Sequence, residues 1–339
     1  MNRRDTITAL LALGAGAPLT AMPQGQKRLG VVGILSPNNA PSPEILANDP
    51  FNKRLRELGW VEGQTLRYEN AYGEGKEDRL PDLAAILVAK KVDVIWAAGP
   101  YAAIAAAQAT ATIPIVFHRT GVPVEMGLVD SLARPGRNVT GLAWSADESI
   151  YVKRYQLLRE LAPTARRLAT LNVHSDLRTM SGELLNEKLT GMFAAMRAAI
   201  RDLGFENRRF VVTKSADLEA ALAQIAEWRA DSLYVPAHEL TGRAHTPILA
   251  FARRHRLITV FETSNWVEDG GLFSYGIVVE PTLVRTADYV DRILRGAKAA
   301  DLPVELPTHH ELAVNITTAR AIGVKIPQSI LVRADRVLE

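Results

Sequence analysis

The chain has 339 residues, no cysteine and a formal net charge of +3. This length is typical of about two domains of ~150 residues each. The small net charge, without a dense Lys/Arg patch interleaved with aromatic residues, argues against nucleic acid as a partner. Without cysteine the protein has no disulfide, no thiolate metal ligand and no lipid-modified cysteine, so its stability depends on its apolar core.

The first 26 residues are interpreted as a secretory signal peptide followed by a polar linker. Residues 1–5 include the basic pair Arg3-Arg4. Residues 6–21 are apolar but fewer than a membrane-spanning helix usually needs. We expect cleavage near Ala21 and a periplasmic protein, with a permanent membrane anchor as the alternative. The Arg3-Arg4 pair leaves both the general secretory route and the twin-arginine route open.

From residue 29 onward, short apolar runs alternate with amphipathic or alanine-rich segments. Such runs are typical of strands buried on both faces, and the alternation predicts a doubly wound α/β sheet. The first series predicts strands at 29–35, 65–72, 92–98, 113–117 and 139–143 and helices at 51–58, 79–89, 101–109 and 124–132.

A second series of similar size follows, with the same architecture but no obvious sequence repeat. It predicts strands at 167–173, 209–213, 231–235 and 258–261 and helices at 149–161, 181–203, 217–228 and 246–255. We therefore expect an α/β protein of two doubly wound, Rossmann-like lobes with a cleft between them.

The remaining segment adds elements to both lobes, because both are already built when it begins. It predicts strands at 272–276 and 311–315, helices at 282–294 and 318–322, and extended pieces at 302–307 and from 326 onward. Chain crossings of this kind make a multi-strand hinge. We expect residues 27–145 with about 271–305 in the first lobe, and residues 146–270 with about 306–339 in the second.

The candidate ligand-binding residues are polar and aromatic side chains in the turns that follow predicted strands. In doubly wound sheets, ligands bind beyond the carboxyl ends of the strands. Each residue is individually an ordinary turn former or cap, so their concentration at strand ends is the stronger observation. The predicted site comprises Ser36, Asn38, Gly99, Tyr101, His118, Arg119, Thr120, Asn172, His174, His238, Glu262, Thr263 and Tyr275.

Three of these residues have a specific predicted role. Arg119 follows a buried strand, and its guanidinium can bind a ligand carboxylate through two parallel hydrogen bonds. Tyr101 can stack on a planar ligand, and Glu262 can bind an ammonium group from across the cleft. These roles favour a small carboxylate-bearing ligand.

No enzyme or cofactor motif is present in the sequence. It lacks a Gly-x-Ser-x-Gly elbow and a Gly-x-x-x-x-Gly-Lys phosphate loop, and the turn at Gly99 has too few glycines for dinucleotide binding. His309-His310-Glu311 is adjacent rather than helically spaced, which favours the solvated start of a strand over a metal site. We expect no catalytic residue, no cofactor and no metal.

Several blocks of the chain carry a family resemblance. They are 55–64 (LRELGWVEGQ), 132–141 (LARPGRNVTG), 113–117, 270–276, 299–305 and the tail 317–337. They resemble the ABC-transporter substrate-binding proteins of the tryptophan/tyrosine-binding type, over nearly all of the chain after the signal peptide. The resemblance implies a type I periplasmic-binding fold and delivery of a small solute to a membrane permease powered by an ATPase.

The chain departs from the family pattern after the strand at 113–117. The family usually has a small residue and then Gly-Asp-Pro-Val there, whereas this chain has HRTGVPV at 118–124, with Val122 in place of the acidic residue. The position matters because an aspartate there can contact a ligand ammonium group or cap the following helix.

We therefore expect a monomeric periplasmic receptor of an ABC importer, not an enzyme. Its ligand would be small and carboxylate-bearing, aromatic or amino-acid-like. A sensory receptor of the same fold that feeds a signalling protein is the alternative, and an α/β enzyme using the same cleft is a third possibility. A neighbouring permease gene would favour the importer receptor, and a neighbouring kinase gene the sensory receptor. Turnover of a metabolite panel would identify an enzyme.

Overall fold

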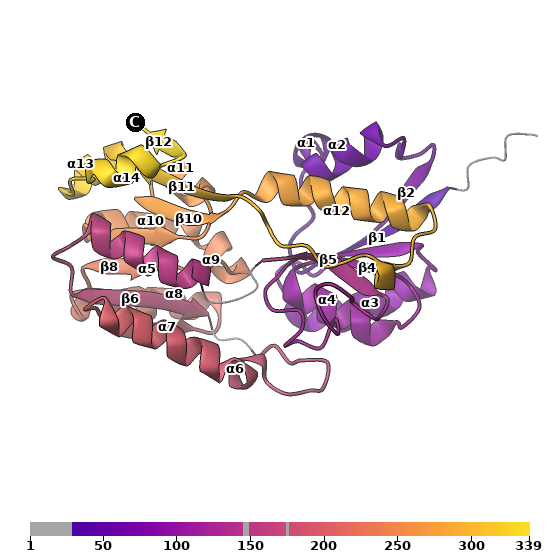
Figure 1. Ribbon diagram of the computed structural model, residues 1–339, viewed down its shortest axis with the longest axis horizontal. Coiled ribbons are helices and arrows are strands. Elements are labelled where there is room, and N and C mark those ends of the chain that lie inside the picture. The colour runs from indigo at the N-terminus through magenta and orange to yellow at the C-terminus, as the bar shows by residue number, and fades with distance from the viewer. Residues whose placement is uncertain (1–28, 145–148, 174–175) are drawn as a thin grey trace, which may run out of the picture.

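The computed structural model describes residues 29–144, 149–173 and 176–339. The expected signal peptide and linker, residues 1–26, and the candidate residue His174 lie outside this part of the chain. The described residues form two α/β lobes that lie side by side along the long axis of the molecule (Figure 1). Each lobe contains a sheet flanked by helices, so the predicted fold class is confirmed.

The first lobe contains a five-stranded parallel sheet with the order β2-β1-β3-β4-β5. Its strands are β1 (Gly30–Ser36), β2 (Leu66–Tyr72), β3 (Val94–Ala98), β4 (Ile115–Thr120) and β5 (Val139–Ala143). Its helices are α1 (Pro43–Asn48), α2 (Pro50–Glu57), η1 (Glu77–Arg79), α3 (Leu80–Ala89), α4 (Gly99–Ala109), α12 (Val279–Leu294) and η3 (Ala299–Asp301).

Strand β3 shows why a continuous apolar run predicts a buried strand. Successive side chains of a strand point to opposite faces of the sheet. Ile95 and Ala97 join the apolar cluster formed with α3 and α4, whereas Val94 packs in the cluster formed with α2 and α12. Both faces are covered, so alternation of polar and apolar residues is lost.

The second lobe contains a seven-stranded sheet with the order β12-β11-β10-β9-β8-β6-β7, in which β10 and β11 are antiparallel. Its strands are β6 (Arg167–Val173), β7 (Glu206–Val212), β8 (Ser232–Tyr234), β9 (Ile258–Phe261), β10 (Phe273–Ile277), β11 (His310–Asn315) and β12 (Arg336–Leu338). The order β7-β6-β8-β9-β10 matches that of the first sheet, although the two sequences share no obvious repeat.

Helices surround the second sheet. They are α5 (Ser149–Leu161), α6 (Leu185–Lys188), α7 (Thr190–Asp202), η2 (Ser215–Asp217), α8 (Leu218–Glu227), α9 (Glu239–Arg243), α10 (His245–Arg254), α11 (Asn265–Glu268), α13 (Ile316–Ile322) and α14 (Gln328–Arg333). Within the described ranges, no helix of either lobe is long and apolar enough to cross a membrane.

The chain passes between the lobes after β5, after β10 and before β11, and the segment after β6 also reaches the first lobe, where Leu177 is buried (Figure 1). Helix α12 belongs to the first lobe, because Tyr289, Val290 and Ile293 are buried in the same apolar cluster as Val32 of β1. Connections that cross repeatedly allow the lobes to rotate about a hinge without unfolding either core.

The predicted lobe boundary near residue 271 requires a correction. The strand expected at 272–276 is β10, which pairs with β9 and with β11 in the second sheet. The chain therefore returns to the first lobe only at Val278, where α12 begins. The apolar run predicts a strand, but its sheet is determined by pairing partners that are distant in the sequence.

Two predicted helices also differ from the structure. Residues 124–132 form turns, because Gly127 adopts a left-handed φ of 72° that interrupts a helix. The helix predicted from residue 181 begins later, at α6. Residues 177–185 instead form a hairpin, in which Leu185 N–H donates to the Leu177 carbonyl at 2.9 Å, and Leu177 is buried in the core of the first lobe.

Candidate functional site

A cleft of about 1470 Å³ lies between the two lobes. The first lobe contributes the carboxyl ends of β1, β3 and β4 and the start of α2, and the second contributes the loops after β8 and β9. The first residues of α12 line it as well. This position follows from the topology, because doubly wound sheets leave a crevice where the strand order reverses.

The cleft brings together many of the residues proposed from the sequence. Those on its wall are Ser36, Asn38, Gly99, Tyr101, His118, Arg119, His238, Glu262 and Thr263. Thr120, Asn172 and Tyr275 do not lie on the described cleft wall. Thr120 is fully buried, Asn172 lies within β6, and the Tyr275 ring stacks on His310 with 5.9 Å between ring centroids.

Some of the predicted residues have a clear structural task. The Ser36 hydroxyl accepts a hydrogen bond from the Asn38 N–H at 3.2 Å and so shapes its own turn. The His238 Nδ1 accepts from the Leu240 N–H at 3.1 Å and caps α9. Burial, helped by the charge of Arg243, lowers the pKa of His238 to about 4, so its ring is neutral at pH 7.

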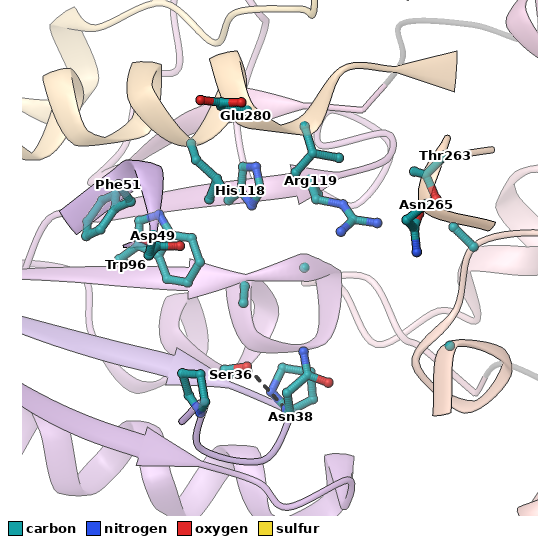
Figure 2. Close-up of a pocket in the computed structure, with 18 of the residues that line it drawn as sticks. Ser36, Asn38, Asp49, Phe51, Trp96, His118, Arg119, Thr263, Asn265 and Glu280 are labelled. Atoms are coloured by element: carbon teal, nitrogen blue, oxygen red, sulfur yellow. Dashed lines mark hydrogen bonds between the residues drawn. The ribbon is translucent and has the colours of Figure 1, made fainter. Parts of the chain in front are cut away.

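An aromatic shelf, defined as Phe51, Trp96 and His118, lies on the first-lobe wall of the cleft (Figure 2). The Phe51 and Trp96 centroids are 5.3 Å apart, and Trp96 stacks on His118 at 5.6 Å with an interplanar angle of 23°. Sequence reasoning missed Phe51 and Trp96, because they look like core residues of a helix and a strand. A planar ligand ring can pack against such a surface.

His118 on this shelf is a neutral hydrogen-bond donor. Its Nε2 lies 2.9 Å from the Thr282 Oγ1, and that hydroxyl donates its only proton to the Val279 carbonyl. The Nε2 must therefore carry the proton that joins it to Thr282. Burial, with a smaller contribution from the charge of Arg119, lowers the pKa of His118 to about 3.

Arg119 reaches the cleft through an irregular end of β4. The β4–β5 register shifts between His118 and Thr120, and Arg119 has a left-handed φ of 60°. Its guanidinium carbon lies 4.5 Å from the centroid of the Trp144 ring. Figure 2 shows the guanidinium directed toward Thr263 of the opposite lobe. Non-glycine residues held in this conformation are concentrated at functional sites.

Glu262 on the opposite wall belongs to a buried ion pair. Its Oε1 accepts from Arg154 Nη1 at 2.9 Å and from the Tyr234 hydroxyl, and its Oε2 accepts from the Ala237 N–H at 3.1 Å. Burial raises the pKa of Tyr234, which therefore stays protonated and able to donate. Glu262 is thus already neutralised, unlike the carboxylate expected from the sequence to await a ligand ammonium group.

Comparison with known proteins places these features in one family. A family model described as ABC transporter substrate binding protein matches residues 32–338. A tyrosine-binding protein of Clostridioides difficile (strain R20291) is 25% identical over 283 residues, which are 82% of this chain and 77% of that protein.

Solved structures show the same fold. A conserved domain protein from Vibrio cholerae has a TM-score of 0.79 at 25% identity, covering 91% of this chain and 100% of its own. An ABC domain from Streptococcus pneumonia in complex with L-Trp has a TM-score of 0.78 at 22% identity, covering 91% of this chain and 99% of its own.

Proposed function

Since the chain belongs to the ABC transporter substrate-binding protein family, we propose that it is an exported receptor that captures a small aromatic, carboxylate-bearing solute. The solute would bind between the lobes and pass to the permease of an ABC importer. The family consists of binding proteins rather than enzymes, which agrees with a role in capture and release.

The observation that supports this ligand class best is the aromatic shelf with Arg119 at its edge. Trp96 offers apolar ring surface with the buried Phe51 behind it, and Arg119 offers a guanidinium that suits a carboxylate. Two similar proteins are named for tyrosine binding or contain L-Trp, which supports an aromatic amino acid or a close analogue.

Binding to both walls would favour a closed form. A ligand that contacts the shelf and the loop at Thr263 together gains more contacts when the lobes approach, so it shifts the population toward closure. The permease can then distinguish the loaded receptor from the empty one by shape. Among the described connections, those after β10 and before β11 are the segments that would bend.

We expect L-tryptophan or L-tyrosine to bind and L-leucine to bind at least tenfold more weakly, because leucine has the same charges but no ring. Saturating ligand should reduce the radius of gyration in solution scattering. It should also raise the melting temperature in line with RT ln(1 + [L]/Kd). Titration calorimetry gives the affinities, and equal binding of leucine and tryptophan would contradict the role of the shelf.

The export route has a separate test. The basic start and short apolar segment of residues 1–21 predict removal of the signal peptide. Intact-mass analysis of a periplasmic fraction should find a chain that begins near Met22. Recovery of the uncleaved chain in the membrane fraction would show a permanent anchor instead.

A further inference from the structure

Asp49 is a carboxylate on the cleft wall for which the sequence suggested no role. It lies beside the aromatic shelf at the start of α2 (Figure 2). Its Oδ1 accepts a hydrogen bond from the Asn52 N–H at 3.0 Å, so α2 fixes its direction. The side chain is half-buried and forms no ion pair with any described residue.

Aromatic side chains share the cleft wall with this carboxylate. Phe51 and Trp96 belong to the shelf beside it, and Tyr68 and Tyr72 of β2 also line the cleft (Figure 2). The Tyr68 hydroxyl donates to the Asn52 Oδ1 at 2.8 Å, and the Asn52 N–H donates to Asp49, so Tyr68 and Asp49 contact the same residue. Burial raises the pKa of both tyrosines, with smaller contributions from the charge of Glu62 at Tyr68 and of Asp49 at both. A carboxylate among aromatic faces is the usual surrounding of a bound organic cation.

Burial makes the ionised form of Asp49 less favourable. It raises the pKa of Asp49 more than the N–H groups of Asn52 and Phe51 and the charges of Arg56 and Lys53 lower it. Arg56 is exposed and donates to the Ala47 carbonyl at 3.0 Å. A ligand cation would therefore offset a cost of burial that the free protein carries.

Six other carboxylates line the cleft. Glu62 is exposed, and Glu77 is half-buried but already interacts with another residue. Arg154 neutralises Glu262, and Arg336 lies 2.7 Å from Glu268 and 3.7 Å from Glu311. Glu280, on α12, is exposed and loses little hydration there. Asp49 is half-buried, and no described residue forms an ion pair with it.

We propose that Asp49 binds the ammonium group of the ligand, with the rings of Phe51, Trp96, Tyr68 and Tyr72 around it. This assignment rests on the proposed function and narrows its ligand to a solute that bears an amine as well as an aromatic ring. It also places ammonium recognition on the first lobe, so the amine can be bound before the second lobe closes.

The test is the substitution Asp49→Asn, measured with two matched pairs of ligands. Asparagine caps a helix as well as aspartate does, so α2 should be retained while the charge is lost. The pairs are L-tryptophan with indole-3-propionate, and L-tyrosine with 3-(4-hydroxyphenyl)propionate, which differ only in the amino group. Glu280→Gln is the control, because it makes the same carboxylate-to-amide change elsewhere in the cleft.

In titration calorimetry at pH 7, the wild type should prefer the amino acid of at least one pair. Asp49→Asn should lower the affinity for that amino acid at least tenfold and change the affinity for its des-amino partner less than twofold. Glu280→Gln should change neither affinity by more than about twofold. The assignment would be overturned if Asp49→Asn lowered the affinity for both members of the pair equally. It would also be overturned if Glu280→Gln, rather than Asp49→Asn, selectively lowered the affinity for the amino acid.

The outcomes also separate this assignment from the proposed function. If the wild type binds the des-amino partners as tightly as the amino acids, an aromatic carboxylate receptor remains and the ammonium site is wrong. If it binds no member of either pair, the proposed ligand class is wrong and the assignment of Asp49 to it falls too.

Discussion

Replacing Arg154 by methionine is expected to lower the free energy of unfolding by about 3–5 kcal/mol, the usual cost of removing one partner of a buried ion pair. The Arg154 side chain is 0% exposed, and that of Glu262 is 6% exposed. Without the guanidinium, Glu262 would keep a buried charge, and its partners among the described residues would be the Tyr234 hydroxyl and the Ala237 N–H. The Tyr275 carbonyl, which accepts from Arg154 Nε at 2.6 Å, would lose its partner too.

Urea unfolding followed by circular dichroism measures this effect. Lys153→Met, one position earlier on α5 and less deeply buried, is the control and should change the free energy of unfolding by less than about 0.5 kcal/mol. Adding Glu262→Gln to Arg154→Met should recover part of the loss, because the uncompensated charge is then gone. Additive losses in the double variant would show that the pair is not coupled.

The ion pair also bears on the shape of the binding site. Arg154 links α5 to β10 through Tyr275 and to the loop after β9 through Glu262. Glu262 in turn holds the Ala237 N–H in the loop after β8. The second-lobe wall is therefore positioned by a side chain that does not itself line the cleft, and a stable Arg154 variant should bind ligand more weakly.

The strands and the place of the cleft were predictable because both depend on local pattern and general topology. The apolar run of β3 is dictated by burial on both faces, and parallel strands bring their carboxyl ends to one edge. The same reasoning predicts that Arg119 and Thr263, at the ends of β4 and β9, face the cleft. Neither argument requires knowing which residues are neighbours in space.

The remaining features depend on contacts between distant segments. The apolar run that forms β10 would predict a strand equally well in either lobe. Its pairing with β9 and β11 places it in the second sheet. Asp49 has the sequence pattern of an ordinary helix cap before Pro50. Its different role appears only when α2 is packed against Trp96 and Tyr68. Arg154 likewise resembles a surface residue of an amphipathic helix.

Replacing Arg119 by alanine is expected to weaken binding of a carboxylate-bearing aromatic ligand by about 1.5–3 kcal/mol, the scale of a hydrogen bond to a charged group. Arg119 lies on the cleft wall beside the shelf, and its guanidinium carbon is 4.5 Å from the Trp144 ring centroid. The opposing view is that Arg119 serves only its contacts within the protein, including that with Trp144, in which case alanine would change the affinity by less than about 0.5 kcal/mol.

Alanine is the appropriate truncation because Arg119 has a φ of 60°. Alanine keeps the Cβ and therefore the backbone strain, whereas glycine would relieve it and alter stability as well as binding. Arg119→Lys should restore only part of the affinity, since an ammonium group lacks the planar fork that matches a carboxylate.

Arg336→Ala is the matched control, because it removes another cleft arginine whose charge Glu268 already pairs at 2.7 Å. Calorimetry with L-tryptophan and with tryptamine, which lacks the carboxylate, isolates the contribution of the ligand carboxylate. Arg119→Ala should lower the affinity for L-tryptophan. It should leave the affinity for tryptamine unchanged or slightly higher, because the guanidinium that repels the ammonium group is gone. Equal weakening of both ligands would assign Arg119 to packing, and unchanged L-tryptophan affinity would reject the carboxylate contact.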